Sequence, residues 1–284
     1  KELEGAEYSV LSVKKGDRSK KPPMPFTTST LQQEASKHLN YSTQKTMRLA
    51  QQLYEGIDIK GNGTVGLITY LRTDSVRISE EADASAREYI KEQYGKAFVS
   101  ETVNAKKNGN KIQDAHEAIR PTDISRTPAM VKESLSRDLF RLYQLIWKRF
   151  LASRMQPAKY ETTSVKISAG KYRFTVAASK IVFQGFRLVY TEAGEEKEEK
   201  SVLMKGLDMV SKLTKESFDT KQHFTQPPAH YTEATLVKAL EELGIGRPST
   251  YAPTISTIIA RRYVAKENKN LYLTELGEVV DNIM

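Results

Sequence analysis

Two kinds of sequence pattern alternate along this chain, and their order constrains the fold more than any other feature. Apolar residues recur at helical intervals between residues 29 and 156 and again beyond residue 225. The other stretches are rich in Val, Ile, Thr, Phe and Tyr, which is typical of antiparallel strands. We expect strands at residues 6–13, 160–169, 172–177, 180–190 and 209–214. This order predicts a multidomain α+β chain, with a helical domain inserted into an antiparallel β-rich unit.

Local signals place the helices and loops within these blocks. Hydroxyl residues with capping spacing predict helix starts at Thr30, Ser42 and Ser79. Leu139 begins a further run of apolar residues at helical intervals, which ends at a Gln-Pro pair. Residues 14–25 are rich in Lys and Pro and lack an apolar pattern, so we expect a linker or surface loop there.

The last 60 residues form a third pattern. Thr232 is expected to start a helix that ends at Gly244, and Ser249 is expected to start the next helix. A short strand is expected at residues 271–273. Two helices joined by Gly-Ile-Gly and followed by a strand resemble a helix-turn-helix or winged unit. Residues 225–284 are therefore predicted to be a separate helical segment.

Composition limits the partners and the chemistry. The 284 residues carry a formal net charge of +9, which suits a polyanionic partner. The absence of cysteine excludes disulfides, thiolate metal sites and cysteine nucleophiles. No apolar run approaches the roughly 18 residues of a membrane span, so no membrane partner is expected. The chain begins without Met or a signal peptide, and we expect it to be cut from a longer protein.

Two glycine-rich matches to nucleotide-binding motifs fail on their context. Residues 61–66 match G-x-G-x-x-G, but that fingerprint must follow a strand and open a helix, whereas here it follows a helical pattern. Gly56 and Gly61 have P-loop spacing, but Asn62 and Gly63 stand where Lys and Ser/Thr are required. We therefore expect no nucleotide site and no use of ATP.

Residues 66–75, Gly-Leu-Ile-Thr-Tyr-Leu-Arg-Thr-Asp-Ser, carry the strongest chemical signal. Residues two apart in an extended backbone point to the same side, so Tyr70 and Arg72 can face one phosphate together. A guanidinium favours the phenolate form of a tyrosine, whose pKa is ordinarily about 10, and stabilises charge on a phosphoryl centre. On residue types alone, a strand-end tyrosine beside a surface arginine is the simpler interpretation.

This decapeptide resembles the active-site signature of type IA DNA topoisomerases, the bacterial topoisomerase I family. Residues 113–121, Gln-Asp-Ala-His-Glu-Ala-Ile-Arg-Pro, resemble the second motif of that family. Residues 231–237 together with residues 244–251 resemble the third. The motifs follow the family's order and span nearly the whole chain. A tyrosine recombinase would do similar chemistry with scattered Arg, Lys and His residues, but the decapeptide favours the topoisomerase.

The resemblance implies a toroid and a reaction. It implies a discontinuous β arch at residues 1–28 and 157–224, a helical domain with the tyrosine at 29–156, and part of a DNA-binding base at 225–284. The family is ATP-independent: one strand is cut through a 5′-phosphotyrosine intermediate, another strand passes, and the break is resealed, which relaxes negative supercoils. The implied partner is mainly single-stranded DNA, and the implied location is the bacterial cytoplasm, associated with the nucleoid.

The same resemblance assigns site residues. Tyr70 is implied as the catalytic nucleophile, with Arg72 as a phosphate ligand beside it. The implied DNA-binding residues are Arg72, His116, Arg247, Ser249, Thr250, Arg261 and Arg262. Structural alternatives stay open for several of these residues.

Each alternative is an ordinary structural role. His116 can be a structural hydrogen-bonding residue, and Ser249 can simply cap a helix. Arg261 and Arg262 can compensate a helix dipole. Glu117 and Arg120, which follow His116, can pair with each other and fix their loop.

Family members also need Mg²⁺, held by an Asp-x-Asp-x-Glu cluster on an N-terminal toprim domain. This chain contains no Asp-x-Asp pair, so we expect no metal ligands in it and a toprim domain as its partner within the same protein. Alone, it is expected to bind single-stranded DNA without relaxing supercoils. The alternatives are a non-catalytic DNA-binding module that uses the helix pair at residues 232–262, or a structural scaffold.

Overall fold

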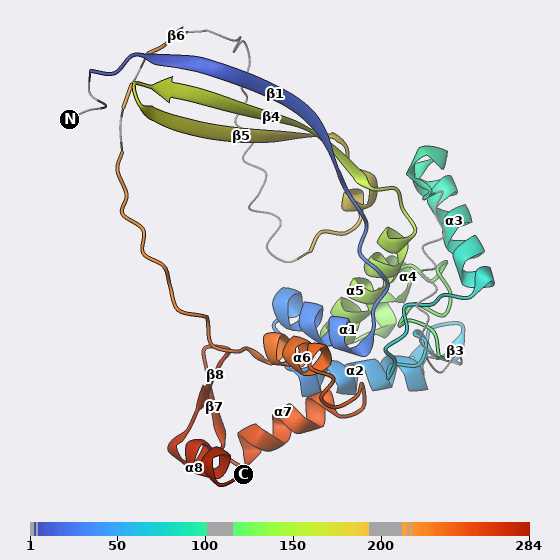
Figure 1. Cartoon of the computed structure of the whole chain (residues 1–284). Helices are drawn as coiled ribbons and strands as arrows, with labels where there is room; N and C mark the ends of the chain where they lie inside the picture. The colour runs from blue at the N-terminus through green and yellow to red at the C-terminus, as the bar shows by residue number, and fades with distance from the viewer. Residues whose placement is uncertain (1–2, 4, 101–115, 193–211, 215, 218) are drawn as a thin grey trace. The chain divides into compact units, whose positions relative to one another are not determined.

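The computed structural model describes residues 3, 5–100, 116–192, 212–214, 216–217 and 219–284, and these residues divide into two compact units (Figure 1). The strand unit comprises Lys1–Lys21, Pro157–Leu188 and Gly194–Pro227. The helical unit comprises Pro22–Gln156, Val189–Ala193 and Pro228–Met284. The predicted mixture of helices with antiparallel sheets is confirmed. The boundaries of the arch, the tyrosine-bearing domain and the base stay a prediction.

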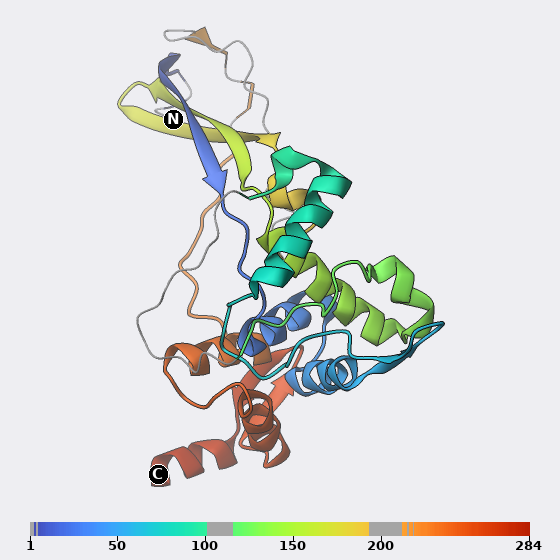
Figure 2. The ribbon, with the colours of Figure 1, turned by 90° about the vertical axis from the view of Figure 1, so that its right-hand side faces the viewer.

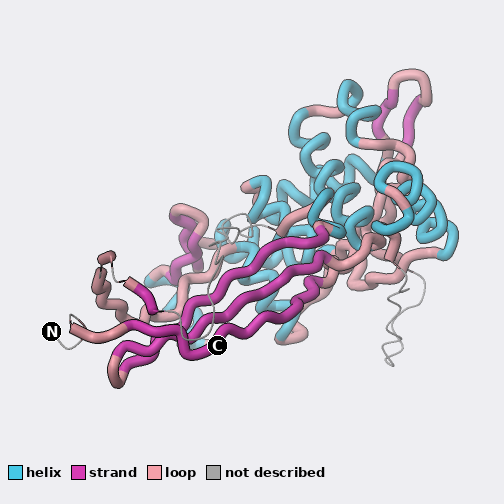
Figure 3. The backbone as a smooth tube through the Cα atoms, turned by 90° about the horizontal axis from the view of Figure 1, so that it is seen from above, coloured by secondary structure: helices cyan, strands magenta, loops and turns pink. Residues whose placement is uncertain are grey.

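The strand unit is built on one antiparallel sheet with the strand order β5-β4-β1-β6 (Figure 3). Its strands are β1 (Tyr8–Lys20), β4 (Ala158–Ala169), β5 (Tyr172–Phe183) and β6 (Lys212–Leu213). β4 and β5 form a long hairpin, whose turn contains Gly170 with a φ of 58°. Glycine adopts this left-handed conformation at little cost, which explains the tight reversal. The unit also contains the 3₁₀ helix η4 (Gly185–Leu188).

The predicted loop at residues 14–25 is partly wrong. Residues 14–20 continue β1 and pair one by one with β4, from Lys14 opposite Ser164 to Lys20 opposite Ala158. Cross-strand hydrogen bonds thus override the low strand propensity of Lys, Gly and Asp. The sequence pattern could not reveal this extension, because Lys14 to Ser19 are exposed and no apolar alternation is needed.

A second correction concerns the later strands. Residues 172–177 and 180–190 were expected as two strands, but β5 is continuous from Tyr172 to Phe183. The Ala-Ala-Ser-Lys stretch between them, which suggested a break, pairs with β4. Beyond Phe183 the chain turns into η4, because Gly185 takes a φ of 51° and ends the extended conformation.

The helical unit contains most of the helices. They are α1 (Thr28–Glu34), the π-helix η1 (Ala35–Leu39), α2 (Thr43–Glu55), α3 (Glu80–Tyr94), η2 (Lys96–Phe98), α4 (Pro128–Val131), η3 (Lys132–Ser134), α5 (Arg137–Ser153), α6 (Glu233–Glu242), α7 (Tyr251–Ala260) and α8 (Glu275–Ile283). Ser42, Ser79 and Thr232 cap α2, α3 and α6 as predicted. The first helix starts earlier than expected: Thr27 is its N-cap, and Thr30 closes the capping box from the third helical position.

Helix α5 supplies much of the core of this unit. Its apolar stripe includes Leu142, Tyr143, Ile146, Trp147 and Phe150, all of which are buried. The polar atoms on this stripe are satisfied: the Tyr143 hydroxyl donates to the Arg126 carbonyl (2.6 Å) and the Trp147 indole to the Ile124 carbonyl (3.0 Å). Each fully buried large apolar side chain stabilises the fold by roughly 1.5–3 kcal/mol.

Two small hairpins complete the helical unit. β2 (Ile57–Ile59) pairs with β3 (Gly63–Val65), and β7 (Val264–Glu267) pairs with β8 (Asn270–Leu273). The predicted strand at residues 271–273 is confirmed as part of β8. Helices α6 and α7 with this second hairpin have the element order of a winged unit, which leads into α8 (Figure 2, red). No described helix is long and apolar enough to cross a membrane.

A buried polar cluster lies beside α1. Arg149 donates to the Met24 carbonyl (2.6 Å), to the Tyr190 hydroxyl (3.1 Å) and to Glu192 (3.1 Å). Tyr190 in turn donates to Glu34 (3.2 Å). The Arg149 side chain is only 8% exposed, so its charge is satisfied almost entirely by the protein. Through these bonds, α5 holds the segments around residues 24 and 190.

The carboxylate of Glu34 makes stability depend on pH. Burial alone would raise its pKa, but the contacts with His38 (3.1 Å) and Lys37 (3.3 Å) lower the pKa to about 2. Because the folded pKa lies below the ordinary value of 4.5, the stabilisation is complete above that value and is lost as the pH falls towards 2. Such a shift is worth at most about 3 kcal/mol, and solvent screening reduces it.

We therefore expect the free energy of unfolding to fall more steeply below pH 4.5 in the natural protein than in a Glu34→Gln variant. Urea titrations at a series of pH values measure both slopes. If the free energy of unfolding falls equally steeply with decreasing pH in the two proteins, the folded state does not favour the ionised form of Glu34.

Candidate nucleophile and anion site

The Tyr70 segment is an irregular stretch with bends at Thr69, Leu71 and Arg72. Only Ile68 forms a bridge, with Pro121, so the predicted extended stretch is not a regular strand. Leu67, Ile68 and Leu71 are buried. Tyr70 is half-buried and Arg72 is exposed. The buried Leu71 therefore lies between two side chains that reach solvent, but its backbone and that of Arg72 are bent, so the alternation of an extended strand does not explain this arrangement.

Hydroxyl groups hold this segment from both sides. The Thr28 hydroxyl, at the start of α1, lies 2.7 Å from the Leu71 carbonyl and accepts from the Thr73 amide at 2.9 Å. On the other side, the Thr69 hydroxyl donates to the Ala118 carbonyl at 2.7 Å and accepts from the Arg120 amide at 3.0 Å. The backbone on each side of Tyr70 is therefore fixed, which restricts where its ring can point.

The last turn of α2 also contacts the segment. The Leu67 amide donates to the Leu53 carbonyl at 2.7 Å. A Cβ atom at Gly66 would lie 2.7 Å from the Tyr54 carbonyl oxygen, closer than Cβ atoms approach other atoms. Glycine is thus required at position 66 for this close approach of backbone to backbone.

Two aromatic rings flank Tyr70. The His116 ring is stacked against it, with centroids 5.4 Å apart and planes inclined by 28°. The Tyr54 ring meets it edge-on at 5.6 Å and 70°. These are the geometries that aromatic pairs prefer. The structure therefore brings together Tyr70 and His116, which the sequence singled out, and adds Tyr54, which it did not.

Sequence reasoning missed Tyr54 because its position in α2 matched the apolar face of that helix, together with Met47, Ala50 and Leu53. Gly56 and Gly61 were the sequence signal that could have indicated Tyr54. They form the turn after α2 that brings the chain back alongside this helix before Tyr70. Tyr54 is 40% exposed and therefore not a core residue.

We expect Tyr54→Ala to slow formation of any covalent bond at Tyr70 by roughly 3- to 10-fold, because losing an aromatic contact worth about 0.5–1.5 kcal/mol lets the Tyr70 ring reorient. Tyr54→Phe keeps the ring and should restore the rate. Single-turnover kinetics measure the effect. A ¹⁹F spectrum of fluorotyrosine at position 70 should broaden or shift in Tyr54→Ala alone, whereas an unchanged spectrum would contradict a positioning role.

Behind His116, the loop is fixed by an ion pair. Arg120 contacts Glu117 at 2.7 Å and also donates to the Pro121 carbonyl at 3.0 Å. The expected Glu117–Arg120 pairing is confirmed. His116 itself is exposed. Residues 113–115 of this motif lie outside the described residues.

The α6–α7 turn holds the third set of predicted residues. Arg247, Ser249 and Thr250 are all exposed there. The Thr250 hydroxyl accepts from the Arg247 amide at 2.8 Å, and the Arg247 guanidinium donates to the Gly246 carbonyl at 2.6 Å. The three residues therefore form one compact turn before α7.

The predicted helix start at Ser249 is wrong. Helix α7 begins at Tyr251, and Thr250 occupies the cap position without a side-chain hydrogen bond to the helix. The Thr250 hydroxyl is engaged with Arg247 instead. Ser249 lies in the turn, so the structural alternative of plain capping by Ser249 is also excluded.

Helix α1 links this turn to the Tyr70 segment. Next to Thr28, Ser29 donates to Glu241 in the last turn of α6 at 2.6 Å. Burial raises the pKa of Tyr251, and the charges of Glu241 and Asp74 raise it further. Asp74 thus lies within electrostatic reach of the first residue of α7. Tyr70 and Arg247 therefore belong to neighbouring parts of one unit.

A second polar contact joins α6 to the helix before Tyr70. Glu233 accepts from the amide (2.7 Å) and the hydroxyl (2.9 Å) of Thr43, the first residue of α2, and from Lys266 at 2.6 Å. Burial would raise the pKa of Glu233, but Lys266 and Thr43 lower it. The carboxylate therefore stays charged at the positive end of α2.

Arg261 and Arg262 lie apart from the other predicted residues. They follow the C-terminal end of α7, a helix about 15 Å long, whereas Arg247 precedes its N-terminal end. Both are exposed, and Arg262 has a φ of 59°. The structure thus brings Tyr70 and His116 together, with Arg72 two residues along the chain, and gathers Arg247, Ser249 and Thr250 at another place, with Arg261 and Arg262 in neither group.

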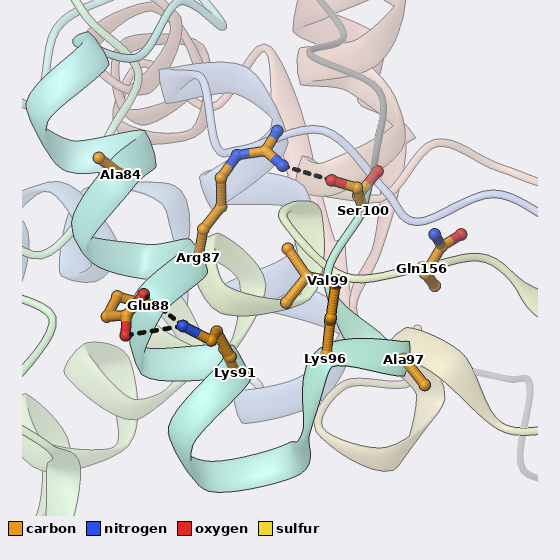
Figure 4. Close-up of a pocket in the computed structure, with 9 residues that line it drawn as sticks. All are labelled: Ala84, Arg87, Glu88, Lys91, Lys96, Ala97, Val99, Ser100 and Gln156. Carbon is orange, nitrogen blue, oxygen red and sulfur yellow. Dashed lines mark hydrogen bonds and ion pairs between the residues drawn. The ribbon is translucent and has the colours of Figure 1, made fainter.

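The helical unit also contains an open cavity of about 640 Å³ beside α3 (Figure 4). It is lined by Ala84, Arg87, Glu88, Lys91, Lys96, Ala97, Val99, Ser100 and Gln156. None of the predicted site residues lines it. The Arg87 guanidinium donates to Asp83 and to the Ser100 carbonyl, so it has a structural role here.

In the part of the chain that the structure describes, no three or more His, Cys, Asp or Glu side chains are grouped so that they could hold a metal ion. These described residues therefore offer no clustered site for the Mg²⁺ implied by the sequence resemblance.

Comparison with known proteins agrees with the sequence resemblance. A family model described as DNA topoisomerase matches residues 1–284. The solved structure of full-length topoisomerase I from Thermotoga maritima is 40% identical in sequence, with a TM-score of 0.86. The match covers 99% of this chain and 45% of the Thermotoga chain. The present chain therefore spans less than half the length of that protein.

Proposed function

Because this chain belongs to the bacterial type IA DNA topoisomerase family, we propose that it carries the nucleophile with which such an enzyme cuts one DNA strand. The observation that best supports this proposal is the placement of Tyr70. Its backbone is fixed on both sides, its ring is flanked by His116 and Tyr54, and it is not sealed in the core.

In the proposed reaction, the phenolic oxygen of Tyr70 attacks a backbone phosphorus atom. A phosphotyrosine bond forms to the 5′ side, the bond to the 3′ oxygen breaks, and that oxygen leaves as a hydroxyl while the phenol gives up its proton. One phosphate ester replaces another, so the bond energy is kept and resealing needs no ATP. Strand passage between cutting and resealing would relax negative supercoils.

The cationic neighbours would hold the phosphate during this exchange. Arg72 is exposed two residues from the nucleophile, and its guanidinium can stabilise charge on the phosphoryl oxygens. His116 stacks on the ring of Tyr70 and can bind a phosphate when its imidazole is charged. The proposed role of both residues is phosphate binding.

The α6–α7 turn is the proposed contact for the flanking DNA backbone. Arg247, Ser249 and Thr250 present a guanidinium and hydroxyl groups together, the groups that most often contact phosphates in protein–DNA complexes. Arg261 and Arg262 would contact the strand further along. We expect single-stranded DNA to be the preferred partner, in the bacterial cytoplasm.

We further propose that the acidic residues and Mg²⁺ of the reaction belong to a toprim domain outside these 284 residues. No step above requires a metal ligand from this chain. Alone, the chain should bind single-stranded DNA and leave supercoiled DNA unrelaxed. If this chain alone relaxed supercoiled DNA in the presence of magnesium, the proposal that the acidic residues lie on a separate toprim domain would be wrong.

The deciding experiment is to trap a covalent complex. A topoisomerase that includes this chain and a toprim domain is mixed with labelled single-stranded DNA and denatured, and the labelled peptide is identified by mass spectrometry. We expect a bond between Tyr70 and a 5′ phosphate. A linkage at any other residue, or none that survives denaturation, would overturn the proposal.

A further inference from the structure

The sheet of the strand unit has two faces of different charge. Directly paired residues in antiparallel strands share a face, and consecutive residues alternate between faces. The three long strands β1, β4 and β5 lie side by side in Figure 3. Their register therefore tells on which of the two faces each side chain lies. Lys14, Arg18 and Lys166 fall on the same face, since their partners on the neighbouring strand are Ser164, Tyr160 and Ser12.

This cationic face, defined by Lys14, Arg18 and Lys166, carries no carboxylate. Within β1, β4 and β5 as described, the acidic residues are Asp17 and Glu161, which pair with each other on the opposite face. Between the cations lie small and hydroxyl side chains. They include Gly16, Thr162, Ser164, Thr175 and Ser179.

The three cations are available to a ligand. Lys14, Arg18 and Lys166 are all exposed. Among the described residues, no carboxylate lies within ion-pair distance of any of them. Arg18 stacks over the Tyr160 ring at 4.4 Å, and the hydroxyl of that ring accepts from Arg187 at 2.5 Å. Tyr160 thereby holds two guanidinium groups near one end of this face.

The opposite face has a different composition. It carries Lys15, Lys159 and Lys180 beside Asp17 and Glu161, so its net charge is only +1. It also carries the apolar residues Val13, Val165 and Val176, of which Val165 is fully buried. Its two carboxylates offset most of the attraction that its lysines would exert on a polyanion, and its valines offer no phosphate contact.

We propose that the cationic face of this sheet binds the phosphate backbone of a DNA strand. Lysine, arginine and hydroxyl side chains are the groups that contact phosphate and sugar, and such contacts need no particular base sequence. Lys14 and Arg18 are about 13 Å apart along β1, and Lys166 lies on the adjacent strand, so the face can contact several successive phosphates. This surface is additional to the Tyr70 site and does not depend on Tyr70 being the nucleophile.

The test compares two double variants with the same change in charge on the same sheet. Lys14→Gln with Lys166→Gln alters the cationic face, and Lys15→Gln with Lys180→Gln alters the opposite face. All four lysines are exposed, so both proteins should fold, which circular dichroism melting checks. Binding to a fluorescent single-stranded oligonucleotide is measured by anisotropy between roughly 50 and 200 mM salt.

Each phosphate contact contributes about 0.7 to the slope of log affinity against log salt for a single strand. We therefore expect the Lys14/Lys166 variant to lose about 1.4 of that slope and the Lys15/Lys180 variant to lose little. Equal losses in both variants would show a non-specific charge effect and overturn the proposal. An unchanged slope in the Lys14/Lys166 variant would overturn it as well. The readout is equilibrium binding, so it stays valid if Tyr70 proves not to be the nucleophile.

Discussion

Replacing Tyr70 with phenylalanine in a topoisomerase that includes this chain is expected to abolish the covalent DNA complex, with a loss of cleavage on the order of 10³-fold or more. Phenylalanine keeps the ring between His116 and Tyr54 but has no oxygen to attack phosphorus. Affinity for single-stranded DNA should change less than about 3-fold, because Arg72 and the α6–α7 turn are untouched. Denaturing gels and anisotropy measure the two quantities.

The matched control is Tyr54→Phe, which removes the same hydroxyl group from the neighbouring ring. It should form the covalent complex at nearly the natural rate, since only ring packing is required of Tyr54. A covalent complex that persists in Tyr70→Phe would refute the assignment of the nucleophile. Loss of the complex in both variants would point instead to a general disturbance of this aromatic cluster.

The second large effect concerns stability. Arg149→Ala should lower the free energy of unfolding by about 3–5 kcal/mol, because it removes a buried guanidinium and leaves several hydrogen-bond partners, including the buried Tyr190 hydroxyl, without their donor. The Met24 carbonyl, the Tyr190 hydroxyl and the Glu192 carboxylate all lose a hydrogen bond. The Phe26 and Tyr190 rings also lose the guanidinium that lies 4.9 and 5.2 Å from their centres.

Chemical denaturation followed by tryptophan fluorescence measures this loss well, because Trp147 lies on the same helix and is buried. Arg137→Ala is the appropriate control. Arg137 is the first residue of α5 and is exposed, so its replacement should cost less than about 0.5 kcal/mol. If both variants lose a similar amount of unfolding free energy, the hydrogen bonds of the buried Arg149 cluster do not stabilise the fold.

The sequence predicted best where local physics decides the structure. Ser42, Ser79 and Thr232 were identified as caps because an N-cap hydroxyl satisfies amides of its own helix and needs no distant partner. The amphipathic run that became α5 was visible because burial of one face imposes a helical period. The family resemblance singled out Tyr70 and His116, which the fold then places in contact.

Prediction failed where a distant segment decides. The second half of β1 has exposed, charged side chains, and only the register with β4 makes it a strand. Tyr54 has the spacing of a core residue in α2, yet the turn after that helix places its ring against Tyr70. In these two cases the deciding contact lies outside the window that periodicity can examine. Ser249 is different, because the contact that displaces it as a cap is local: the Thr250 hydroxyl accepts from the Arg247 amide three residues away.

The adjacent hydroxyl residues at the start of α1 have a mechanical consequence. The Thr28 hydroxyl ties the helix to backbone groups of the Tyr70 segment, whereas Ser29 reaches α6 through a single side-chain bond to Glu241. Any motion that separated α6 from α1 and α2 would have to break the Ser29–Glu241 and Thr43–Glu233 bonds, whereas the bonds from Thr28 would keep the Tyr70 segment on α1.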